Sequence, residues 1–306
     1  MTSALFATQP IRAGGSTIQP EVLASIQKAS ANTGVDFSYL MAQASRESSF
    51  DPSAKASTSS ATGLYQFVEQ TWLGTFKEHA ADYGYADLAA SITKRSDGRY
   101  AVADPQARKQ ILYLRRDSSL NAAMAAELAS DNKTKMEAAL GHPVTATDLH
   151  LAHFLGLSGA LRFIRKLDSE PSTTGASLFP RAAAANNSVF YDENGHARTV
   201  SEIYTCMNNS ITSDQQAFAS LENTSAGTTT AMASASTSPA TATEGTLQGF
   251  SNPGSILSPL LLVTIAALPL ANEDEKSAAS HGSPRHGAIR PQVRPSVNPM
   301  AALGLG

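Results

Sequence analysis

Cysteine is nearly absent from this chain of 306 residues, which contains only Cys206. A single cysteine cannot form an intrachain disulfide, and it argues against a cysteine-based metal site. We expect Cys206 to be a small buried apolar residue. One cysteine fits both a reducing and an oxidising compartment, so cysteine usage does not place the protein.

Charged residues are scarce as well. Asp, Glu, Lys and Arg make up 16% of the chain, against about 25% in typical globular proteins. The shortfall is proportionally greatest after residue 222, where Ala, Ser and Thr dominate. The formal net charge is -3, and the arginines of the tail are widely spaced. This charge distribution argues against nucleic acid as a partner.

A long hydrophobic run is also missing. The most apolar stretch, residues 256–270, has 15 residues and includes Pro259 and Pro269. A membrane-spanning helix needs about 20 apolar residues, so we expect this segment to be buried or to dock on a protein partner, with a membrane anchor as the alternative. The first residues have no early positive charge and no apolar run before Pro10, so we expect no ordinary secretory signal peptide.

The sequence does contain a long stretch of apolar residues at helical spacing. This pattern predicts a mainly α domain over residues 16–222. We expect residues 1–15 to be a flexible tail. Residues 223–306 are typical of a low-complexity linker and a disordered tail around the apolar segment 256–270.

Caps and breakers indicate where the helices begin and end. Asp36 is placed to cap a helix over residues 36–48, and Thr147 or Asp148 is placed to cap a later one. Asn194-Gly195, between two β-prone runs, predicts a short β-hairpin. The other predicted helices cover residues 19–32, a segment that starts within 63–66 and passes Phe76, and residues 105–117, 120–140, 199–207 and 213–221.

One carboxylate, Glu47, lies in the last turn of the helix predicted over residues 36–48. At about 100° per residue, it lies beside Leu40 on the border of the apolar stripe. Partial desolvation at such a border favours a protonated carboxyl group, which suits a general acid. The alternative is a glutamate that faces solvent or pairs with Arg46. The position of Glu47 on the helix favours this alternative when it is considered alone. The residues that follow Glu47 in the sequence favour the general acid instead.

A loop of small polar residues and a glycine-containing segment follow this helix. Residues 53–62 lead into Gly63-Leu64-Tyr65-Gln66-Phe67. Gly63 would let the backbone approach a ligand closely, and Gln66 offers both an amide donor and an acceptor, as a sugar site needs. Trp72, the only tryptophan, lies at helical spacing from apolar neighbours, so we expect it in the core rather than against a sugar.

Two histidines, His150 and His153, lie three residues apart on the helix predicted after residue 147. One interpretation is a metal pair, but the spacing is not that of an HExxH motif and no nearby carboxylate completes a ligand set. We therefore expect no metal site here, and a single histidine that points into a cleft.

Glu47-Ser48-Ser49-Phe50, Ser57 and Gly63-Leu64-Tyr65-Gln66 follow one another in this order. Their types and spacing resemble the SLT-domain lytic transglycosylases, enzymes of lysozyme-like fold that cleave bacterial peptidoglycan. The resemblance covers about residues 18–165. Where that family has a tyrosine-containing motif, this chain has Ala152-His153-Phe154-Leu155-Gly156, which is similar to a branch that includes some phage-type endolysins.

The resemblance implies a role for each matched residue. Glu47 would be the single acid/base that cleaves the β-1,4 bond between N-acetylmuramic acid and N-acetylglucosamine, leaving a 1,6-anhydromuramyl end. Ser57, Tyr65 and Gln66 would bind the substrate. His153 would orient Glu47 or contact the substrate in the place of the family's tyrosine. The resemblance also implies peptidoglycan strands as the partner, no cofactor, a monomer, and a location in the cell envelope, in the periplasm or outside the cell.

Two other functions stay open from the sequence. A muramidase on the same fold would need a second carboxylate to activate water. The candidates, none of which lies in a motif, are Asp51, Asp82, Asp87, Asp97 and Asp104. A non-catalytic protein for peptidoglycan binding or envelope assembly would suit the linker and the apolar segment 256–270, whereas an intact Glu47 argues against it.

Overall fold

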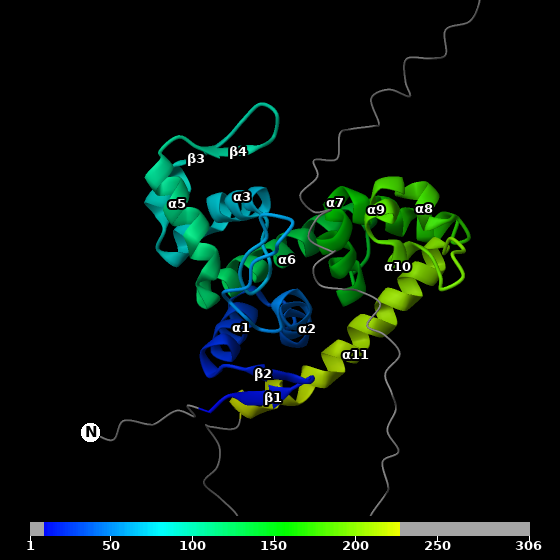
Figure 1. Ribbon diagram of the computed structural model, residues 1–306, viewed down its shortest axis with the longest axis horizontal. Coiled ribbons are helices and arrows are strands. Elements are labelled where there is room, and N and C mark those ends of the chain that lie inside the picture. The colour runs from blue at the N-terminus through cyan, green and yellow to red at the C-terminus, as the bar shows by residue number, and fades with distance from the viewer. Residues whose placement is uncertain (1–8, 227–306) are drawn as a thin grey trace, which may run out of the picture. The chain divides into compact units, whose positions relative to one another are not determined.

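Helices dominate the part of the protein that the structure describes. The computed structural model describes residues 9–226, and Figure 1 shows helices joined by loops and two short hairpins. This confirms the predicted mainly α fold class. The predicted linker, the apolar segment 256–270 and the tail lie outside the described residues, except that helix α11 extends to Ala226.

The described chain begins with a hairpin, not with the flexible tail expected through residue 15. Strands β1 (Ile11–Ala13) and β2 (Ser16–Ile18) pair antiparallel. The turn between them uses Gly14 and Gly15, with φ of 55° and 75°, and such left-handed pairs suit a two-residue hairpin turn. The turn packs on the second half of α11, because a Cβ on Gly14 would lie 2.5 Å from the Phe218 ring.

The first two helices follow the predicted caps. Helix α1 (Pro20–Thr33) ends at Gly34, which has φ of 71° as expected for a left-handed C-cap. Helix α2 (Phe37–Ser48) begins after Asp36, whose carboxylate accepts a hydrogen bond from the backbone N–H of Tyr39 at 2.7 Å. The N-cap role predicted for Asp36 is therefore confirmed.

Residues 63–67 form a turn, whereas the sequence predicted the first turn of a helix. Gly63 and Gln66 have φ of 91° and 46°, values that an α-helix does not allow. Helix α3 (Glu69–His79) begins only after this turn. A Cβ on Gly63 would lie 1.9 Å from the carbonyl oxygen of Arg115. Glycine is thus required here by the approach of the protein's own backbone, and not by a ligand.

The remaining elements follow in chain order. Between α3 and the long helices lie η1 (Ala80–Tyr83), α4 (Ala86–Ala90), β3 (Ile92–Lys94), β4 (Tyr100–Val102), α5 (Pro105–Tyr113) and η2 (Leu114–Arg116). The long helices and their connections are α6 (Ser118–Leu140), α7 (Ala146–Ser169), α8 (Gly175–Leu178), α9 (Pro180–Ala185), α10 (Asn187–Phe190) and α11 (Val200–Ala226).

Helix α7 differs from its prediction at both its start and its middle. Its N-cap is Thr145, not Thr147 or Asp148. Thr145 and Asp148 form a capping box, in which the Asp148 carboxylate accepts the N–H of Thr145 at 2.7 Å. At Gly156, φ is 73° and ψ is 164°. This conformation is essentially restricted to glycine and breaks the helix into two halves.

The C-terminal part of the described chain also departs from expectation. The predicted hairpin at Asn194-Gly195 is reduced to a turn closed by a single bridge between Tyr191 and Ala197, because the preceding residues form α10. The two helices predicted over residues 199–207 and 213–221 are one continuous helix, α11.

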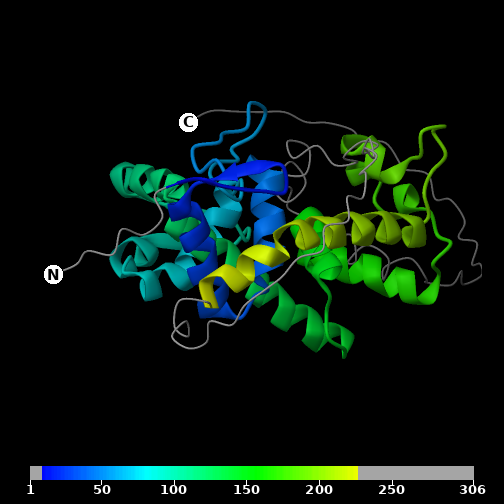
Figure 2. The same ribbon diagram turned by 90° about the horizontal axis from the view of Figure 1, so that it is seen from below.

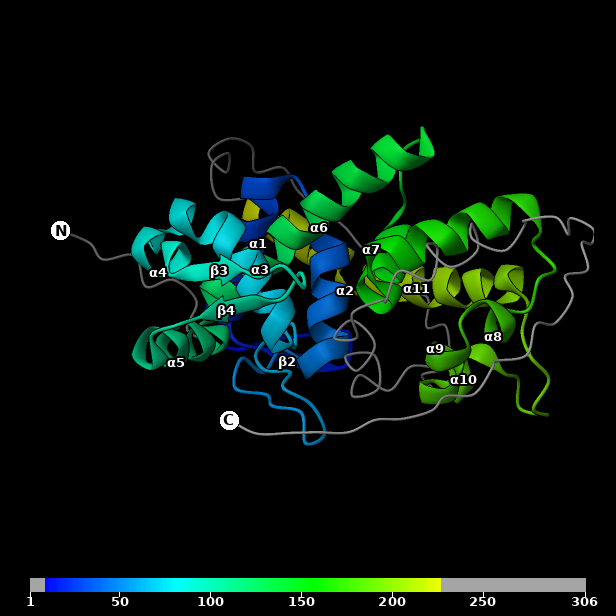
Figure 3. The same ribbon diagram turned by 90° about the horizontal axis from the view of Figure 1, so that it is seen from above.

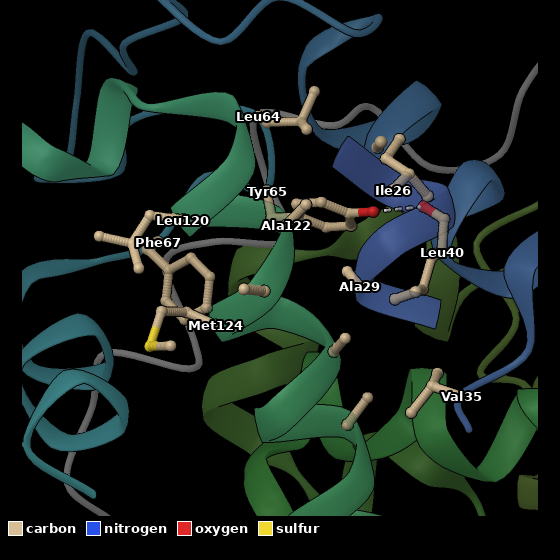
Figure 4. Close-up of a cluster of buried hydrophobic side chains, with 14 of the residues drawn as sticks. Ile26, Ala29, Val35, Leu40, Leu64, Tyr65, Phe67, Leu120, Ala122 and Met124 are labelled. Atoms are coloured by element: carbon tan, nitrogen blue, oxygen red, sulfur yellow. Dashed lines mark hydrogen bonds between the residues drawn. The ribbon is translucent and has the colours of Figure 1, made fainter. Parts of the chain in front are cut away.

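Two hydrophobic clusters form the core. The first is built mainly by α1, α2, α3 and α6, and Figure 4 shows part of it around Leu40, Leu64 and Met124. Trp72 is fully buried in this cluster and donates from Nε1 to the carbonyl of Ile111 at 2.8 Å, as expected of a core residue. The second cluster is built by α7 through α11.

Helix α11 connects the two clusters. It packs on α7 and on α2, and Figures 2 and 3 show its first half beside α7. Its second half reaches the first cluster, where Phe218 meets Phe50 edge to face with ring centroids 5.5 Å apart. Cys206, expected to be buried, is only half-buried on this helix.

Candidate active site

The Glu47 side chain lies inside the protein. It is in the last turn of α2 and is 1% exposed. The alternative expectation, that Glu47 faces solvent or pairs with Arg46, is wrong. The neighbouring Arg46 points to α11 instead, where it pairs with Asp214 and donates to the hydroxyl of Ser210.

His153 of α7 is the hydrogen-bond partner of Glu47. Its Nε2 lies 2.9 Å from Oε1 of Glu47, and its side chain is 28% exposed. Burial lowers the pKa of His153, but the negative charge of Glu47 and the hydrogen bond to it act in the opposite direction. The net result is a pKa of His153 above its usual value. His153 is therefore held in its charged form more readily than a free imidazole by its hydrogen bond to Glu47.

A cavity of about 170 Å³ lies on the far side of this histidine. His153 and Gly156 belong to its wall, whereas Glu47 does not. Glu47 is therefore buried beside a residue of the cavity wall, to which it is hydrogen-bonded. The wall comes from α2, the turn after the loop, α3, α6 and α7, and its residues are Tyr39, Leu40, Gln43, Tyr65, Gln66, Phe67, Val68, Thr71, Ala125, Leu128, Ala129, Asn132, Leu149, Ala152, His153, Gly156 and Leu157.

Tyr65 and Gln66 line the cavity, but their polar groups hold the protein together. The Tyr65 hydroxyl donates to the carbonyl of Leu40 at 3.0 Å, the dashed line in Figure 4. Burial raises the pKa of this hydroxyl well above its usual value. Nε2 of Gln66 donates to the carbonyls of Ala54 and Gly63, at 3.1 and 2.8 Å. Both residues thus fix the loop and the turn against α2.

The comparison with known families applies to the part of the chain that supplies these residues. Residues 24–92 match the family model described as the transglycosylase SLT domain. This segment is a transglycosylase SLT domain. It indicates a peptidoglycan-cleaving enzyme of the lytic transglycosylase type that acts in the cell envelope, and it agrees with the predicted lysozyme-like α fold. Among the helices of residues 9–226, none is long and apolar enough to cross a membrane.

The match contains Glu47, Ser57, Tyr65 and Gln66 but ends before α5. His153 therefore reaches the site from outside the matched segment, and the assignment to an endolysin-like branch stays a prediction. Ser57 lies exposed in the loop and is not part of the cavity wall.

Two residues that sequence reasoning missed hold the loop of the SLT domain in place. Nη1 of Arg115 donates to the carbonyls of Ser60 and Phe67, at 2.6 and 3.0 Å. Asn121 is fully buried and accepts the N–H of Tyr65 at 2.9 Å. These contacts join residues about 50 positions apart, at separations of 48 to 56, so no local pattern reveals them.

A second missed contact lies one helical turn from Glu47. Gln43 donates from Nε2 to Nδ1 of His150 at 2.8 Å. Burial, and then the positive charges of Arg46 and His153, lower the pKa of His150 well below its usual value, so His150 is neutral. Gln43 and Glu47 lie four residues apart, which is the one sequence signal that could have linked Gln43 to the site. Within residues 9–226 no group of three or more His, Cys, Asp or Glu is arranged to hold a metal.

Proposed function

We propose that this SLT domain is a lytic transglycosylase in which Glu47 is the single acid/base. Its substrate is the β-1,4 bond between N-acetylmuramic acid and N-acetylglucosamine, and its product carries a 1,6-anhydromuramyl end. The observation that carries the proposal is the buried Glu47 carboxyl, bonded at 2.9 Å to a histidine in the wall of the cavity. Glu47 thus lies one side chain away from the space that a sugar would enter.

The lack of carboxylates in the cavity wall favours this reaction over hydrolysis, because Glu47 is linked to the wall through His153 and no further carboxylate lines the cavity. The wall residues include no Asp or Glu. The aspartates that a muramidase might use are all exposed. Two of them have local structural roles, since Asp51 accepts from Ser53 and Asp104 caps α5. A hydrolase usually places its two carboxyl groups across the scissile bond, and among residues 9–226 we identify only Glu47 in such a position.

A single carboxyl group can complete this reaction in two steps. In the first step, the Glu47 carboxyl donates its proton to the glycosidic oxygen as the bond to the anomeric carbon breaks. In the second step, the Glu47 carboxylate takes the proton of the muramyl 6-hydroxyl as that oxygen bonds to the anomeric carbon. No water is consumed. Such positioned acid/base catalysis is typically worth about 10²–10⁴-fold in rate.

His153 has two parts in this mechanism. Across the 2.9 Å hydrogen bond, its Nε2 can return a proton to Glu47 before the first step. Because Glu47 is 1% exposed, the imidazole must also turn aside before the carboxyl group can touch a sugar. We assign Tyr65 and Gln66 to shaping the sugar-facing wall, and Ser57 to a sugar contact at the exposed edge of the loop.

The test is mass spectrometry of the muropeptides that the protein releases from purified sacculi, with Glu47→Gln as the matched variant. We expect wild type to release fragments one water lighter than those from lysozyme, and Glu47→Gln to release at least about 100-fold less. Thermal unfolding of both proteins would establish that the variant is folded.

The other outcomes identify the alternative functions. Hydrated reducing ends from wild type would make the protein a muramidase. Binding to sacculi without release, by wild type and variant alike, would make it a peptidoglycan-binding protein. Full activity of a folded Glu47→Gln protein would refute the role of Glu47.

A further inference from the structure

Positive charge is concentrated in one segment of the chain. Residues 92–117 contain seven Lys and Arg against three Asp, a net charge of +4, whereas the rest of the chain carries -7. The segment forms the β3–β4 hairpin, α5 and η2, and β4 packs against α5. Six of its seven cations are exposed, the exception being Arg115. A local excess of one sign of charge on a protein surface attracts ligands of the opposite sign.

The protein neutralises this charge only in part. Arg95 pairs with Asp97, and Arg108 pairs with Glu69. The other four exposed cations form no ion pair within residues 9–226, and they are Lys94, Arg99, Lys109 and Arg116. The first two of these belong to the hairpin. The surface therefore has free positive charge for a ligand.

The hairpin is fixed to the helix that supplies part of the cavity wall. Gln70 of α3 donates from Nε2 to the carbonyl of Tyr100 at 3.1 Å, and its Oε1 accepts the N–H of Tyr100 at 2.9 Å. The Tyr100 ring packs against Gly74, where a Cβ would lie 2.8 Å from it. Thr71, the residue after Gln70, lines the cavity. The hairpin therefore lies beside the α3 wall of the cavity.

The turn of the hairpin points toward the helices that form the other walls. In Figures 1 and 3 the hairpin begins beside α4 and α5 and extends along α3 toward the side where α2 and α7 lie. The N–H of Arg95 donates to the carbonyl of Arg99 at 2.8 Å and closes the turn. Lys94 lies over the Tyr100 ring, with Nζ 5.7 Å from the ring centroid. The cationic residues are thus held at this end of the hairpin.

We propose that the β3–β4 hairpin binds carboxylate groups on the peptide stems of a peptidoglycan strand, with Lys94 and Arg99 as the binding residues. The stems are attached to the muramyl residues and carry free carboxylates, so they are the anionic part of this substrate. An extended peptide of about four residues reaches about 13 Å, and a helix with its side chains is about 10–12 Å across. A stem can therefore pass from a sugar beside Thr71 to the hairpin on the same helix. The inference rests on the proposed function for its substrate, and not for the chemistry of Glu47.

Binding of the full chain to soluble glycan strands tests the site, with Glu47→Gln in every protein so that strands are not cleaved. The three ligands are strands with intact stems, strands whose stem carboxylates have been converted to N-methylamides, and strands stripped of their stems. We expect intact strands to bind about 3- to 20-fold more tightly than either of the others, because an exposed ion pair changes affinity by up to about fivefold. At 1 M salt the Debye length falls to about 3 Å, and we expect this preference to disappear.

Lys94→Gln combined with Arg99→Gln removes the free cations of the hairpin. We expect this variant to bind intact strands about 3- to 20-fold more weakly and to bind amidated and stripped strands as before. Lys28→Gln combined with Arg181→Gln is the matched control, because it removes the same charge from exposed residues of α1 and α9. Its affinity for all three ligands should be unchanged. Thermal unfolding of both variants would establish that they are folded.

Equal affinity for intact and amidated strands would overturn the proposal, and this comparison needs no change in the hairpin. Equal losses in the hairpin variant and the control would also overturn it. So would binding to phosphatidylglycerol vesicles or duplex DNA that the hairpin variant loses, without a preference for intact strands, because the partner would then be a phosphate group. Cleavage of strands by a Glu47→Gln protein would refute the role of Glu47 alone, whereas binding that ignores the carboxylates would refute the hairpin site alone.

Discussion

At the scale of single residues, the pairing of Glu47 with His153 sets a condition on catalysis. The Glu47 carboxyl group is 1% exposed, and the residue of the cavity wall that bonds to it is His153. If Glu47 is the acid/base as we propose, a sugar has to displace the imidazole before it reaches the carboxyl group. The energy of that displacement has to come from contacts between the substrate and the cavity wall, so a short glycan with few contacts should be a poor substrate.

The same pair predicts how stability depends on pH. The pKa of His153 is raised in the folded protein, and its value in the unfolded chain is about 6.5. Above pH ~6.5 the folded state therefore binds more protons than the unfolded state. The stabilisation that protonated His153 gives to the folded protein is complete below pH ~6.5. It is lost as the pH rises through the pKa that His153 has in the folded protein. We expect the melting temperature of wild type to fall over this window, measured by thermal unfolding from about pH 5 to pH 9.

The His153→Gln variant should lack this pH dependence, because it has no group that titrates there. His142→Gln is the control, since His142 is exposed in the turn after α6, and its curve should follow that of wild type. Identical slopes for wild type and His153→Gln would contradict the prediction. The groups around the imidazole are Glu47 on α2 and His150 on its own helix. His150 stays neutral across this window because its pKa is lowered well below the usual value.

The sequence located the residues of this pair but not their surroundings. Glu47 and His153 were found because motif order and spacing single them out. The sequence did not predict the backbone carbonyls that Nε2 of Gln66 bonds to, because only the folded turn brings them close; its binding to a substrate stays a prediction. Gln43 and His150 went unpaired in the sequence because 107 positions separate them. Contacts of that range follow from helix packing, which a local pattern does not encode.

At the scale of elements, α11 holds the helix that carries Glu47 near both of its ends. Near the start of α2, Gln215 donates to the carboxylate of Asp36 at 3.1 Å. Near its end, Arg46 pairs with Asp214. Both contacts come from outside the matched SLT segment, residues 24–92. The helix that carries Glu47 is thus held in place by a helix that the family match does not contain.

We expect Asp214→Asn to destabilise the protein by about 1.5–3 kcal/mol, the usual contribution of a hydrogen bond to a charged group. The Arg46 side chain is 11% exposed, so its charge would lose its partner while staying mostly buried. Chemical denaturation measures the free energy of unfolding. Lys133→Gln is the control, because the pair of Lys133 with Glu137 is exposed and such pairs contribute about 0–1 kcal/mol. Equal effects of the two substitutions would contradict the importance of α11.

The ends of helices could be predicted where a capping residue in the sequence sets them. They could not be predicted where contacts between distant segments set them. Asp36 and Gly34 are recognisable because capping uses the residue itself. The two short helices predicted over 199–207 and 213–221 form one continuous helix. Between them, Ser210 accepts a hydrogen bond from Arg46, and Ile211 is buried. Their weak helix propensity is overridden by these tertiary contacts. The N-terminal hairpin was missed for a similar reason, since Phe218 packs on its turn.

At the scale of the whole molecule, the described residues are held together by chain segments far apart in sequence. The hairpin at residues 11–18 and the second half of α11 meet around Phe218, which is 1% exposed. The second cluster, from α7 to Met207 of α11, has no part in the SLT match and yet carries His153 on its first helix. A unit that contains the proposed acid/base Glu47 together with His153 therefore has to include both clusters and the helix that connects them.

This requirement predicts where the chain tolerates truncation. A protein that ends after Ala226 keeps both clusters and all contacts of α11 with α2, so we expect its melting temperature and its muropeptide release to match those of the full chain.

A protein that ends after Asn209 keeps the second cluster but loses Asp214 and Phe218. Loss of a buried phenylalanine side chain alone costs about 3–5 kcal/mol, so this shorter protein should unfold at a much lower temperature and release no muropeptides. Thermal unfolding and sacculus digestion of the full chain and of the two truncated proteins, measured in parallel, test both expectations. Failure of the longer truncation to fold would mean that residues beyond 226 belong to the catalytic unit, and an active shorter truncation would mean that α2 keeps its position without α11.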